Sequence, residues 1–358
     1  MMGKDKKKRI LIAGFEIGGQ MQLLAETLRK RGFEATSLAF NNDFMNFNND
    51  IKIELKNRFE RYLFFIWALK HFHVFHFFWG VSLISFWRFH LLDLPILKLF
   101  GKKVFPHFRG LDIVDIKYFD YLRSVTNGKN IEKPPMSRKG QLKALKKWYR
   151  YSDKILVSEP DLFYVAKNSI LSPQVINMNY WATNEEPLSE KDGVIRVVHA
   201  PSSRRKKGTE YVEKAILSLQ KKGYKVELLL AEKLEANLIK DFYAKADIGI
   251  DQLLYGWHGK VSCELMAMKK PVICYINPKF GKHKPDLPII SATPNDIENQ
   301  LEKLIKDKVL RKKIGDASLQ YVKKYHDVEV EVDNLLKIYG FLDEEKNMTQ
   351  EKKNIKTW

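Results

Sequence analysis

Cysteine is scarce in this chain. Cys263 and Cys274 are the only two cysteines among 358 residues, and both fall in segments that we predict to be buried. We therefore expect free thiols in a reducing compartment rather than a disulfide framework. No cysteine and histidine residues share the spacing of metal ligands along the sequence, so the sequence predicts no metal site.

Long hydrophobic runs are also missing. The longest stretch without Lys, Arg, Asp or Glu runs from His71 to Trp87 and holds further histidines, two serines and a glycine, which makes it a poor spanning helix. At the N-terminus, Lys4–Arg9 precedes the apolar Ile10–Ala13 as in a leader peptide, but that run is too short and Glu16 soon follows. We predict no transmembrane segment and a cytoplasmic location, with peripheral association at the inner face of the membrane left open.

Acidic residues are outnumbered. The chain has 62 Lys and Arg against 43 Asp and Glu, which leaves a net charge of +19. This balance predicts an anionic partner, and a nucleoside diphosphate, anionic lipid headgroups and nucleic acid are the three candidates. The cations gather in loops, and no recognised RNA or DNA motif is present. We therefore expect no nucleic-acid partner, and a basic nucleic-acid-binding protein is an alternative function.

Strand and helix patterns alternate along the chain in two successive runs. The strand patterns are short apolar segments bounded by charged or turn residues, as buried parallel strands are. Helical patterns separate them, which predicts an α/β protein with parallel sheets. The predicted strands cover residues 9–15, 35–40, 74–78, 103–108 and 154–157 in the first run, and 194–199, 225–231, 246–251 and 272–276 in the second.

A linker separates the two runs. Residues 181–193 are acidic, hold Pro187 and lack apolar periodicity, so we place the domain boundary there. The second run closes with an amphipathic helix, and the residues after it are polar and expected to fray. The predicted division is a first domain at 1–180, a linker at 181–193, a second domain at 194–327, a last helix at 328–341 and a tail at 342–358.

Aromatic residues concentrate between Tyr62 and Phe105, together with His, Leu and interleaved basic residues. Residues 54–70 and 83–100 carry helical patterns, the second interrupted near Pro95. An aromatic stripe at helical spacing is usually part of a core. The alternative is a membrane-interface surface, in which Trp, Phe and the basic residues lie at the level of lipid headgroups.

A strand, a glycine loop, a helix and a further strand follow one another between Asp247 and Ile276. The loop and the N-terminus of the helix, predicted at 261–268, lie at the carboxyl edge of a parallel sheet, where ligands bind. Backbone N–H groups there suit a phosphate, and Glu264 in the helix could reach a ribose or sugar hydroxyl. An ordinary strand–loop–helix is the alternative. We assign a role in binding this ligand to Gly256, Trp257, His258, Gly259 and Lys260.

A cationic turn precedes the first helix of the second domain. Four consecutive cations end at Lys207, and Gly208 follows. Such a run is costly in a buried loop unless an anion neutralises it, so we predict that Arg204 or Arg205 binds phosphate together with Lys207. A solvated basic loop is the alternative. Ser203 and Gly208 complete the predicted set in this turn.

The segment from Asp251 to Val272 resembles the donor-binding signature of the retaining family-4-type glycosyltransferases, also called glycosyl transferases group 1. The match lies in the stretch Glu264-Leu-Met-Ala-Met-Lys-Lys-Pro-Val. The family pairs this glutamate with another one eight residues earlier, where this chain has Gly256. The two-glutamate motif is therefore half present.

Three other stretches are similar to the same family. Lys207-Gly208 fits its phosphate loop, although the position of the family's arginine falls on Ser202. The Gly18-Gly19 turn corresponds to one that faces the donor diphosphate in the family. The stretch Arg109-Gly-Leu-Asp112 stands where many members carry His-Gly-x-Asp beside the reacting sugar. An arginine there could clamp a phosphate or carboxylate but could not act as a base, while Asp112 could orient an acceptor hydroxyl.

The resemblance implies a GT-B fold, in which two Rossmann-like domains face each other and a C-terminal helix crosses back to the first. It implies transfer of a hexosyl group, with retention, from a nucleoside-diphosphate-sugar to a sugar or lipid-linked acceptor in polysaccharide or glycolipid synthesis. No cofactor or metal is expected. An inverting enzyme would need His107 or Asp112 as its base. The catalytic residues assigned in this way are Lys207, Glu264, Asp112 and Arg109.

The missing first glutamate keeps a third function open. A protein that binds a nucleotide-sugar without turning it over would need the same phosphate loops but not the complete motif. The expected partners are the nucleoside-diphosphate-sugar, the acceptor and, as an open option, an anionic membrane surface.

Overall fold

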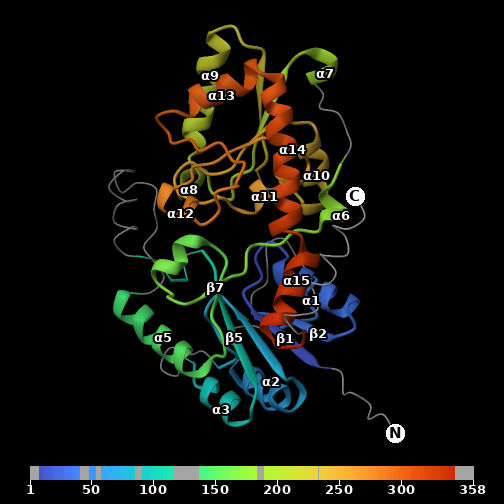
Figure 1. Cartoon of the computed structure of the whole chain (residues 1–358), viewed down its shortest axis with the longest axis vertical. Coiled ribbons are helices and arrows are strands. Elements are labelled where there is room, and N and C mark those ends of the chain that lie inside the picture. The colour runs from blue at the N-terminus through green and yellow to red at the C-terminus, as the bar shows by residue number, and fades with distance from the viewer. Residues whose placement is uncertain are drawn as a thin grey trace, which may run out of the picture.

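The computed structural model describes residues 8–40, 48–53, 58–84, 91–110, 112–113, 115, 137–183, 189–232 and 234–342. Two parallel sheets form the centres of two domains, which lie one above the other along the longest axis of the molecule (Figure 1). The chain enters the lower, first domain, passes to the upper, second domain and returns with its last helix.

The first sheet has seven strands in the order β3-β2-β1-β4-β5-β6-β7, all parallel where neighbours pair. The chain moves outward from β1 to β3 on one side and then continues on the other side with β4. A reversal of this kind opens a crevice at the carboxyl ends of the strands. The strands are β1 (Arg9–Gly14), β2 (Glu34–Ala39), β3 (Ile51–Lys52), β4 (Val74–Phe78), β5 (Lys103–Phe108), β6 (Leu156–Val157) and β7 (Ile170–Leu171).

Helices cover both faces of this sheet. One hydrophobic cluster joins the sheet to α2 (Arg58–His71), α3 (Asp93–Leu99) and α5 (Arg138–Tyr151), with Trp148 fully buried at its centre. A second cluster joins the opposite face to α1 (Gln20–Lys30) and α15 (Val328–Ile338). In α1 the buried residues Met21, Leu24 and Leu28 recur at helical spacing, so the sequence directs one side of this helix onto the sheet.

The second sheet has four parallel strands in the order β11-β10-β8-β9. Its strands are β8 (Ile195–His199), β9 (Val226–Leu230), β10 (Ile248–Ile250) and β11 (Val272–Ile273). Two hydrophobic clusters hold helices against its two faces. The helices of this part of the chain are α6 (Met178–Trp181), α7 (Ser189–Asp192), α8 (Arg204–Lys207), α9 (Thr209–Lys221), α10 (Ala236–Ala244), α11 (Lys260–Ala267), α12 (Pro278–Gly281), α13 (Ile297–Lys306) and α14 (Lys308–Tyr325).

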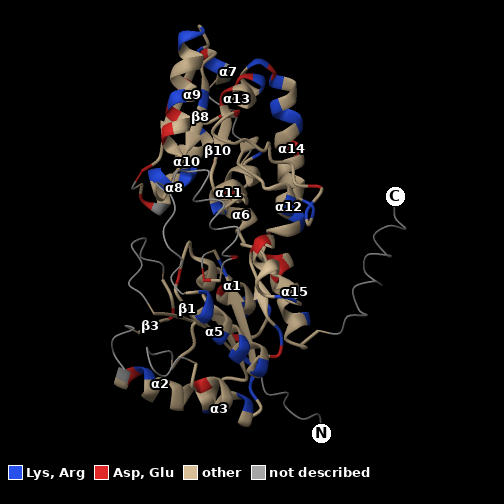
Figure 2. Ribbon diagram, turned by 90° about the vertical axis from the view of Figure 1, so that its left-hand side faces the viewer, with Lys and Arg blue, Asp and Glu red and all other residues tan. Residues whose placement is uncertain are grey.

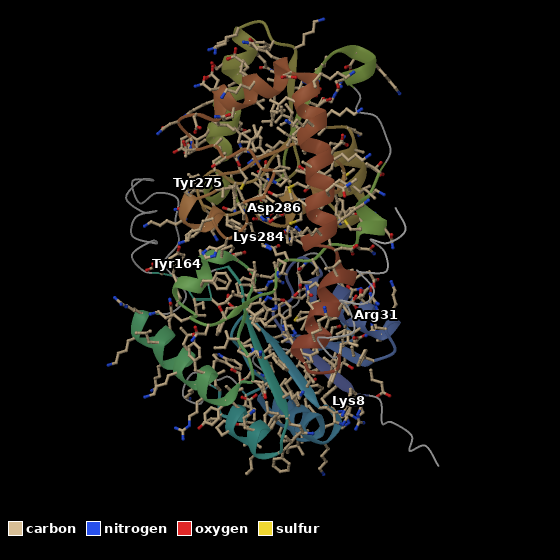
Figure 3. The ribbon with its side chains drawn as sticks, in the orientation of Figure 1. Lys8, Arg31, Tyr164, Tyr275, Lys284 and Asp286 are labelled. Carbon is tan, nitrogen blue, oxygen red and sulfur yellow. The ribbon has the colours of Figure 1, made fainter. Side chains whose placement is uncertain are left out.

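The last helix returns to the first domain. α15 packs against α1, and Val332 and Leu335 of α15 are fully buried in the cluster that also contains Leu24. Arg31, after α1, forms ion pairs of 3.1 and 3.3 Å with Glu329 and Asp333 of α15; Figure 3 labels Arg31 at this edge of the first domain. The α/β fold of two facing Rossmann-like domains with a crossing C-terminal helix is thus confirmed.

The structure corrects several expectations about local structure. β6 is not the last strand of the first sheet, because β7 pairs beside it, and neither β3 nor β7 was predicted. Neither lies in a longer apolar run, whereas the equally short β6 and β11 lie in apolar runs at 155–157 and 272–276 that the sequence reveals. Pro95 does not interrupt a helix: it lies in the first turn of α3, where a missing N–H costs nothing.

Other predicted segments fall partly outside the described residues. This holds for parts of the predicted helices at 54–70 and 83–100, part of the linker and the tail from residue 343. The described part of the linker includes the single-turn helix α7, whereas an irregular segment was expected. Likewise, the cations of the predicted phosphate loop form the single-turn helix α8.

Candidate active site

A cavity of about 1450 Å³ lies between the carboxyl edges of the two sheets. Its walls come from the residues that follow the strands of both domains. The first domain contributes Gly18, Gly19, Trp79, Gly110, Asp115, Glu159, Asp161 and Tyr164, and the second contributes Pro201–Arg204, Lys206, Lys207, Glu232, Gln252, Tyr255, Trp257, Gly259, Lys260, Val261 and Glu264. The cationic turn and the glycine loop, which the sequence predicted as two halves of one site, therefore share a crevice.

The two walls touch at one side of the cavity. The hydroxyl of Tyr164, in the short helix η1 (Pro160–Tyr164), donates to the carbonyl oxygen of Lys279 at 3.2 Å. Its ring also lies 5.8 Å from that of Phe280, centroid to centroid. Figure 3 shows Tyr164 at the upper rim of the first domain, below Lys284 and Asp286 of the second.

Lys207 is held in place by the strand that precedes the glycine loop. Its Nζ lies 2.8 Å from Oδ1 of Asp251 and 2.8 Å from Oε1 of Gln252. The other carboxylate oxygen of Asp251 accepts from the N–H of Gly259 at 2.6 Å and from the hydroxyl of Ser262 at 2.8 Å. Burial raises the pKa of Asp251, but Lys207 and these hydrogen bonds outweigh it and lower the pKa overall. One buried carboxylate thus fixes the lysine beside the start of α11.

The N-terminus of α11 faces the cavity. Its N-cap residue is Gly259. Because glycine has no side chain, it cannot accept hydrogen bonds from the first N–H groups of the helix. The residues Gly259, Lys260 and Val261 all line the cavity. A β-carbon at position 259 would lie 3.1 Å from the Asp251 carboxylate and 3.4 Å from Lys207 Nζ, so glycine is needed for this close approach. Lysine and helix N-terminus together form a site for an anion.

Glu264 lies one turn further along α11, at the cavity wall. Its carboxylate forms an ion pair with Lys260 Nζ at 3.0 Å, and its side chain is buried apart from a small exposed fraction. Burial raises the pKa of Glu264, while Lys260 lowers it. The pairing leaves carboxylate oxygens that can accept hydrogen bonds from ligand hydroxyls.

The Gly18-Gly19 turn meets the same helix from the other side. Both residues line the cavity and have left-handed backbones, with φ of 71° and 72°. A β-carbon on Gly18 would lie 2.9 Å from Cδ of Lys260. The first glycine turn therefore packs onto the residue that begins α11, as the predicted diphosphate site requires.

The N-terminus of α1 itself, however, is already occupied. The buried carboxylate of Glu16 accepts hydrogen bonds from the N–H groups of Gln20, Met21 and Gln22 at 2.8, 3.1 and 3.1 Å. Burial raises the pKa of Glu16, and these N–H groups lower it. The chain's own carboxylate thus fills the position where a helix N-terminus would otherwise bind an anion.

The two arginines of the cationic turn lie differently. Arg204 lines the cavity, where it forms ion pairs with Glu213 and, at 2.9 Å, with Glu232. Arg205 and Gly208 are not among the cavity-lining residues that the structure describes. Since α8 is a single helical turn, its side chains leave in different directions, and Arg204, Lys206 and Lys207 are the cations of this turn that line the crevice.

Arg109 and Asp112 lie below the floor of the cavity rather than in it. The N–H of Arg109 donates to Asp112 at 2.9 Å, and its guanidinium donates to Gln20 at 3.1 Å and stacks over Phe78. Burial lowers the pKa of Arg109 to about 10, and the nearby carboxylates, Glu159 foremost, oppose this. Burial also raises the pKa of Asp112 well above its usual range. Neither side chain lines the cavity where their direct roles at the reacting sugar were expected, but Arg109 lies in the field of Glu159, which does line it.

Glu159, from the first domain, is one of the carboxylates that line the cavity between the two domains. It accepts hydrogen bonds from the Gly110 N–H and the Gln174 side chain, and it lies in the fields of Arg109 and Lys207. Burial nevertheless raises its pKa. The sequence analysis did not select Glu159, but its position two residues after β6 was a signal, because residues at the carboxyl ends of parallel strands face the crevice.

His107 is not placed to act as a base. Its Nε2 lies 2.9 Å from the carbonyl oxygen of Ser172 and must donate to it, so Nδ1 accepts from His76 at 3.1 Å. Nδ1 of His76 in turn accepts from the hydroxyl of Tyr339 at 2.5 Å. Burial lowers the pKa of His107 well below its usual value. Both of its nitrogens are used in a buried chain that ties β4 and β5 to the end of α15.

His258 lies in the protein interior behind the glycine loop rather than in the cavity. Its Nδ1 is 3.8 Å from Sγ of Cys263, which is 3.5 Å from Nδ1 of His326. Burial lowers the pKa of His258 to about 4. Ligand atoms of these three residues lie within 4.8 Å of one another, so among the described residues they could hold a metal ion. The fold brings them together although their sequence spacing gave no indication of it. Gly256 likewise does not line the cavity.

Comparison with known proteins gives structural matches only. No protein-family model and no curated protein sequence matches the chain. The structure is similar to sucrose-phosphate synthase from Thermosynechococcus elongatus, with a TM-score of 0.66 and 14% identity over 93% of this chain and 98% of that one. It is also similar to Anabaena HepE, solved with UDP-glucose, with a TM-score of 0.65 and 11% identity over 93% of this chain and 100% of that one. The chain has the GT-B fold.

A third similar GT-B structure is the lipopolysaccharide outer core galactosyltransferase WaaB, in its apo form. Its TM-score is 0.55 and its identity 13%, over 93% of this chain and 100% of that one. At this level of identity the likeness establishes the shared GT-B fold. In this chain, the crevice of that fold brings together Lys207, the N-terminus of α11 and the Gly18-Gly19 turn.

Three cavity features of this GT-B chain were missed by sequence reasoning. Asp251 was interpreted as the end of a strand, but it holds Lys207 and the glycine loop. Gln252 secures the same lysine, and Glu159 lines the cavity in the field of Lys207. All three lie within two residues of the end of a strand, and polar residues at that position could have identified them.

Proposed function

We propose that this protein is a glycosyltransferase that moves a sugar from a nucleoside-diphosphate-sugar to an acceptor hydroxyl. The observation that carries the proposal is the pairing of Lys207 with the open N-terminus of α11 inside a cavity between two nucleotide-binding folds. That pairing suits a diphosphate. The similar structures support it, since they include HepE in complex with UDP-glucose and the lipopolysaccharide outer core galactosyltransferase WaaB.

In the proposed reaction the glycosidic bond of the donor breaks and negative charge grows on the leaving diphosphate. Lys207, held by Asp251 and Gln252, and the N–H groups of the first turn of α11 stabilise that charge, because they are fixed before the reaction begins. Glu264, held by Lys260, accepts a hydrogen bond from a hydroxyl of the donor. We infer that these groups suffice without a metal, so that a chelator such as EDTA leaves turnover unchanged.

The acceptor enters from the wall of the first domain. Glu159 and Asp161 supply carboxylates there, and Asp115 lies on the same wall. We propose a hexose donor and retention of configuration, with the leaving phosphate itself taking the proton of the acceptor hydroxyl. Because His107 has both nitrogens engaged, an inverting reaction would lack the histidine base that the sequence suggested.

The product class and location follow as parts of the same proposal. The lipopolysaccharide enzymes WaaB and WaaG among the similar structures favour a polysaccharide or glycolipid product. Both cysteines are free and buried, which favours a reducing, cytoplasmic location. Among the described residues, none of the helices has both the length and the apolar character needed to span a bilayer.

The test is a donor panel in two stages. Thermal shift with UDP-, GDP-, ADP- and TDP-sugars identifies the nucleotide that binds, and release of the nucleoside diphosphate in the presence of acceptor sugars measures turnover. We expect Glu264→Gln to keep donor binding within a few-fold and to lower kcat by about 10²-fold. Binding without turnover for every acceptor would favour the non-catalytic binding protein. Tight binding of DNA or RNA that nucleotide-sugars do not compete with would favour the nucleic-acid alternative.

A further inference from the structure

The outer surface of α2 is apolar, although the opposite side of the same helix packs into the core. Phe65 and Ala68 are buried against the first sheet. On the other side, a row at helical spacing is exposed, with Phe59 73%, Ile66 56% and Trp67 46% accessible. A surface helix of a globular protein normally turns charged residues to solvent on that side. The complete exposed row is Phe59, Tyr62, Leu63, Ile66 and Trp67.

α3 continues this surface. Its buried residues Leu94 and Leu97 belong to the same core cluster as Phe65, while Leu99 is 82% and Phe100 59% accessible. Lys102, just after α3, donates to the carbonyl oxygen of Phe72 at the end of α2 at 2.8 Å, which holds the two helices together. Both lie side by side at the lower end of the first domain in two perpendicular views (Figures 1 and 2). Apolar patches of this kind mark interaction sites.

Cations border the apolar surface. α3 packs against α5, whose sequence RKGQLKALKKWYRY contains six cations and no acidic residue. Lys139, Lys143 and Lys146 of α5 are exposed, as is Lys70 at the end of α2. Figure 2 shows α2 as a mostly uncharged helix and α5 with basic residues along it. The partner that fits must therefore accept aromatic and aliphatic side chains and carry negative charge around them.

We propose that α2, α3 and the basic side of α5 form a docking surface for an anionic lipid membrane. The aromatic and aliphatic side chains of α2 and α3 insert at the level of the headgroups, and the lysines of α5 pair with anionic lipids. The core interpretation of the aromatic stripe is confirmed for Phe65 and its buried neighbours, and the present proposal assigns the exposed outer row to the membrane interface. The docking surface belongs to the first domain alone, so membrane binding leaves the donor-binding residues of the second domain out of contact.

The proposal deepens the proposed function by naming where a lipid-linked acceptor would be found, but the surface itself does not depend on that function. The primary experiment is cosedimentation of the purified protein with vesicles of phosphatidylcholine, with and without about 30 mol % phosphatidylglycerol. We expect binding to the anionic vesicles only, weakened by added salt. Equal binding to both kinds of vesicle, or binding to neither, would overturn the proposal.

Variants separate the two components of the surface. Phe59→Glu combined with Ile66→Glu removes the apolar component, and we expect loss of binding to anionic vesicles of at least about 10-fold. Lys139→Gln combined with Lys143→Gln removes two cations, for an expected loss of about five-fold per lysine. The matched controls lie on α14 of the second domain, where Val309 is exposed and Lys312 and Lys313 are exposed cations. Val309→Glu, and Lys312→Gln with Lys313→Gln, should leave vesicle binding unchanged.

Two readouts keep this result apart from the proposed function. Donor binding and turnover with a soluble acceptor should be unaffected in the α2 and α5 variants, since none of their positions lines the cavity. Vesicle binding without any donor turnover would support the docking surface and contradict the proposed enzymatic function. Sedimentation velocity tests whether a second copy of the chain covers this surface instead. If the protein does not bind vesicles but forms a dimer, and Phe59→Glu combined with Ile66→Glu disrupts that dimer, the surface is a dimer interface.

Discussion

Each domain contains a strand, a loop with an acidic residue and a helix that starts with glycine, and the two units use the acid differently. In β1–α1, Glu16 turns toward its own helix and accepts the N–H groups of the first turn. In β10–α11, Asp251 holds Lys207, from an earlier turn of the same domain, and accepts from the N–H of the N-cap residue Gly259. The carboxylate of the first unit thus takes the N–H groups of the first helical turn, whereas that of the second takes the N–H of the N-cap residue and brings a cation beside the helix. The second unit is therefore the proposed anion site.

This difference explains why two glycine motifs of similar appearance carry different roles. The Gly18-Gly19 turn supplies close backbone approach, since a β-carbon on Gly18 would meet Lys260. The loop that ends at Gly259 supplies positive potential as well. A helix N-terminus is less suited to bind an anion where an internal carboxylate, as Glu16 does in α1, already accepts from the N–H groups of the first helical turn.

The largest expected effect comes from removing the cation of the second unit. Lys207→Ala should lower kcat by about 10²–10³-fold, because the charge on the leaving diphosphate then loses its fixed partner. Release of nucleoside diphosphate measures it, and circular dichroism verifies the fold. Arg205→Ala is the matched control in the same turn and should change the rate less than about two-fold. Equal losses in both variants would mean that the overall charge of the turn matters rather than the position of Lys207.

A pair of substitutions tests the comparison directly. Asp251→Asn should lower turnover by about 10–10²-fold, since Lys207 loses its anchor, whereas Glu16→Gln should leave turnover within about two-fold. Glu16→Gln should instead reduce the free energy of unfolding by about 1 kcal/mol, as loss of a helix cap does. Chemical denaturation and steady-state kinetics on both variants measure the two effects. The comparison fails if Glu16→Gln impairs turnover as much as Asp251→Asn.

The smallest expected effect is a difference in pH dependence. Burial raises the pKa of Glu16, so this carboxyl contributes stability at acid pH that is lost as the pH rises through its folded pKa. Burial also raises the pKa of Asp251, but Lys207 and the hydrogen bonds from Gly259 and Ser262 lower it overall. Its contribution is therefore present at neutral pH and lost in acid.

Unfolding free energies of the wild type and both variants across acid to neutral pH measure this difference. The advantage of the wild type over Glu16→Gln should shrink as the pH rises, and its advantage over Asp251→Asn should shrink as the pH falls. Slopes of the same sign for the two variants would contradict the assignment of the two carboxylates to opposite environments.

Much of the fold could be predicted from the sequence, because buried parallel strands and amphipathic helices have local patterns. β4 and β5 were predicted with their observed bounds, and α15 was predicted as the last helix. The two-residue strands β3 and β7 could not be predicted, since their pairing depends only on a neighbouring strand. Likewise, Lys207, Trp257, Gly259 and Lys260 line one cavity as predicted, but the sequence could not tell that Gly256, His258 and, of the four consecutive cations, Arg205 lie outside it.

The sequence by itself determined the alternation of strands and helices, the cationic turn before Gly208 and the glycines before Glu264, because each is a local property of composition and spacing. The tertiary structure alone decided where side chains from distant segments meet. It placed Arg109 under Glu159, joined His258 to His326 and turned Phe59 to the solvent. Which side of an element is buried depends on what packs against it, and that neighbour comes from another part of the chain.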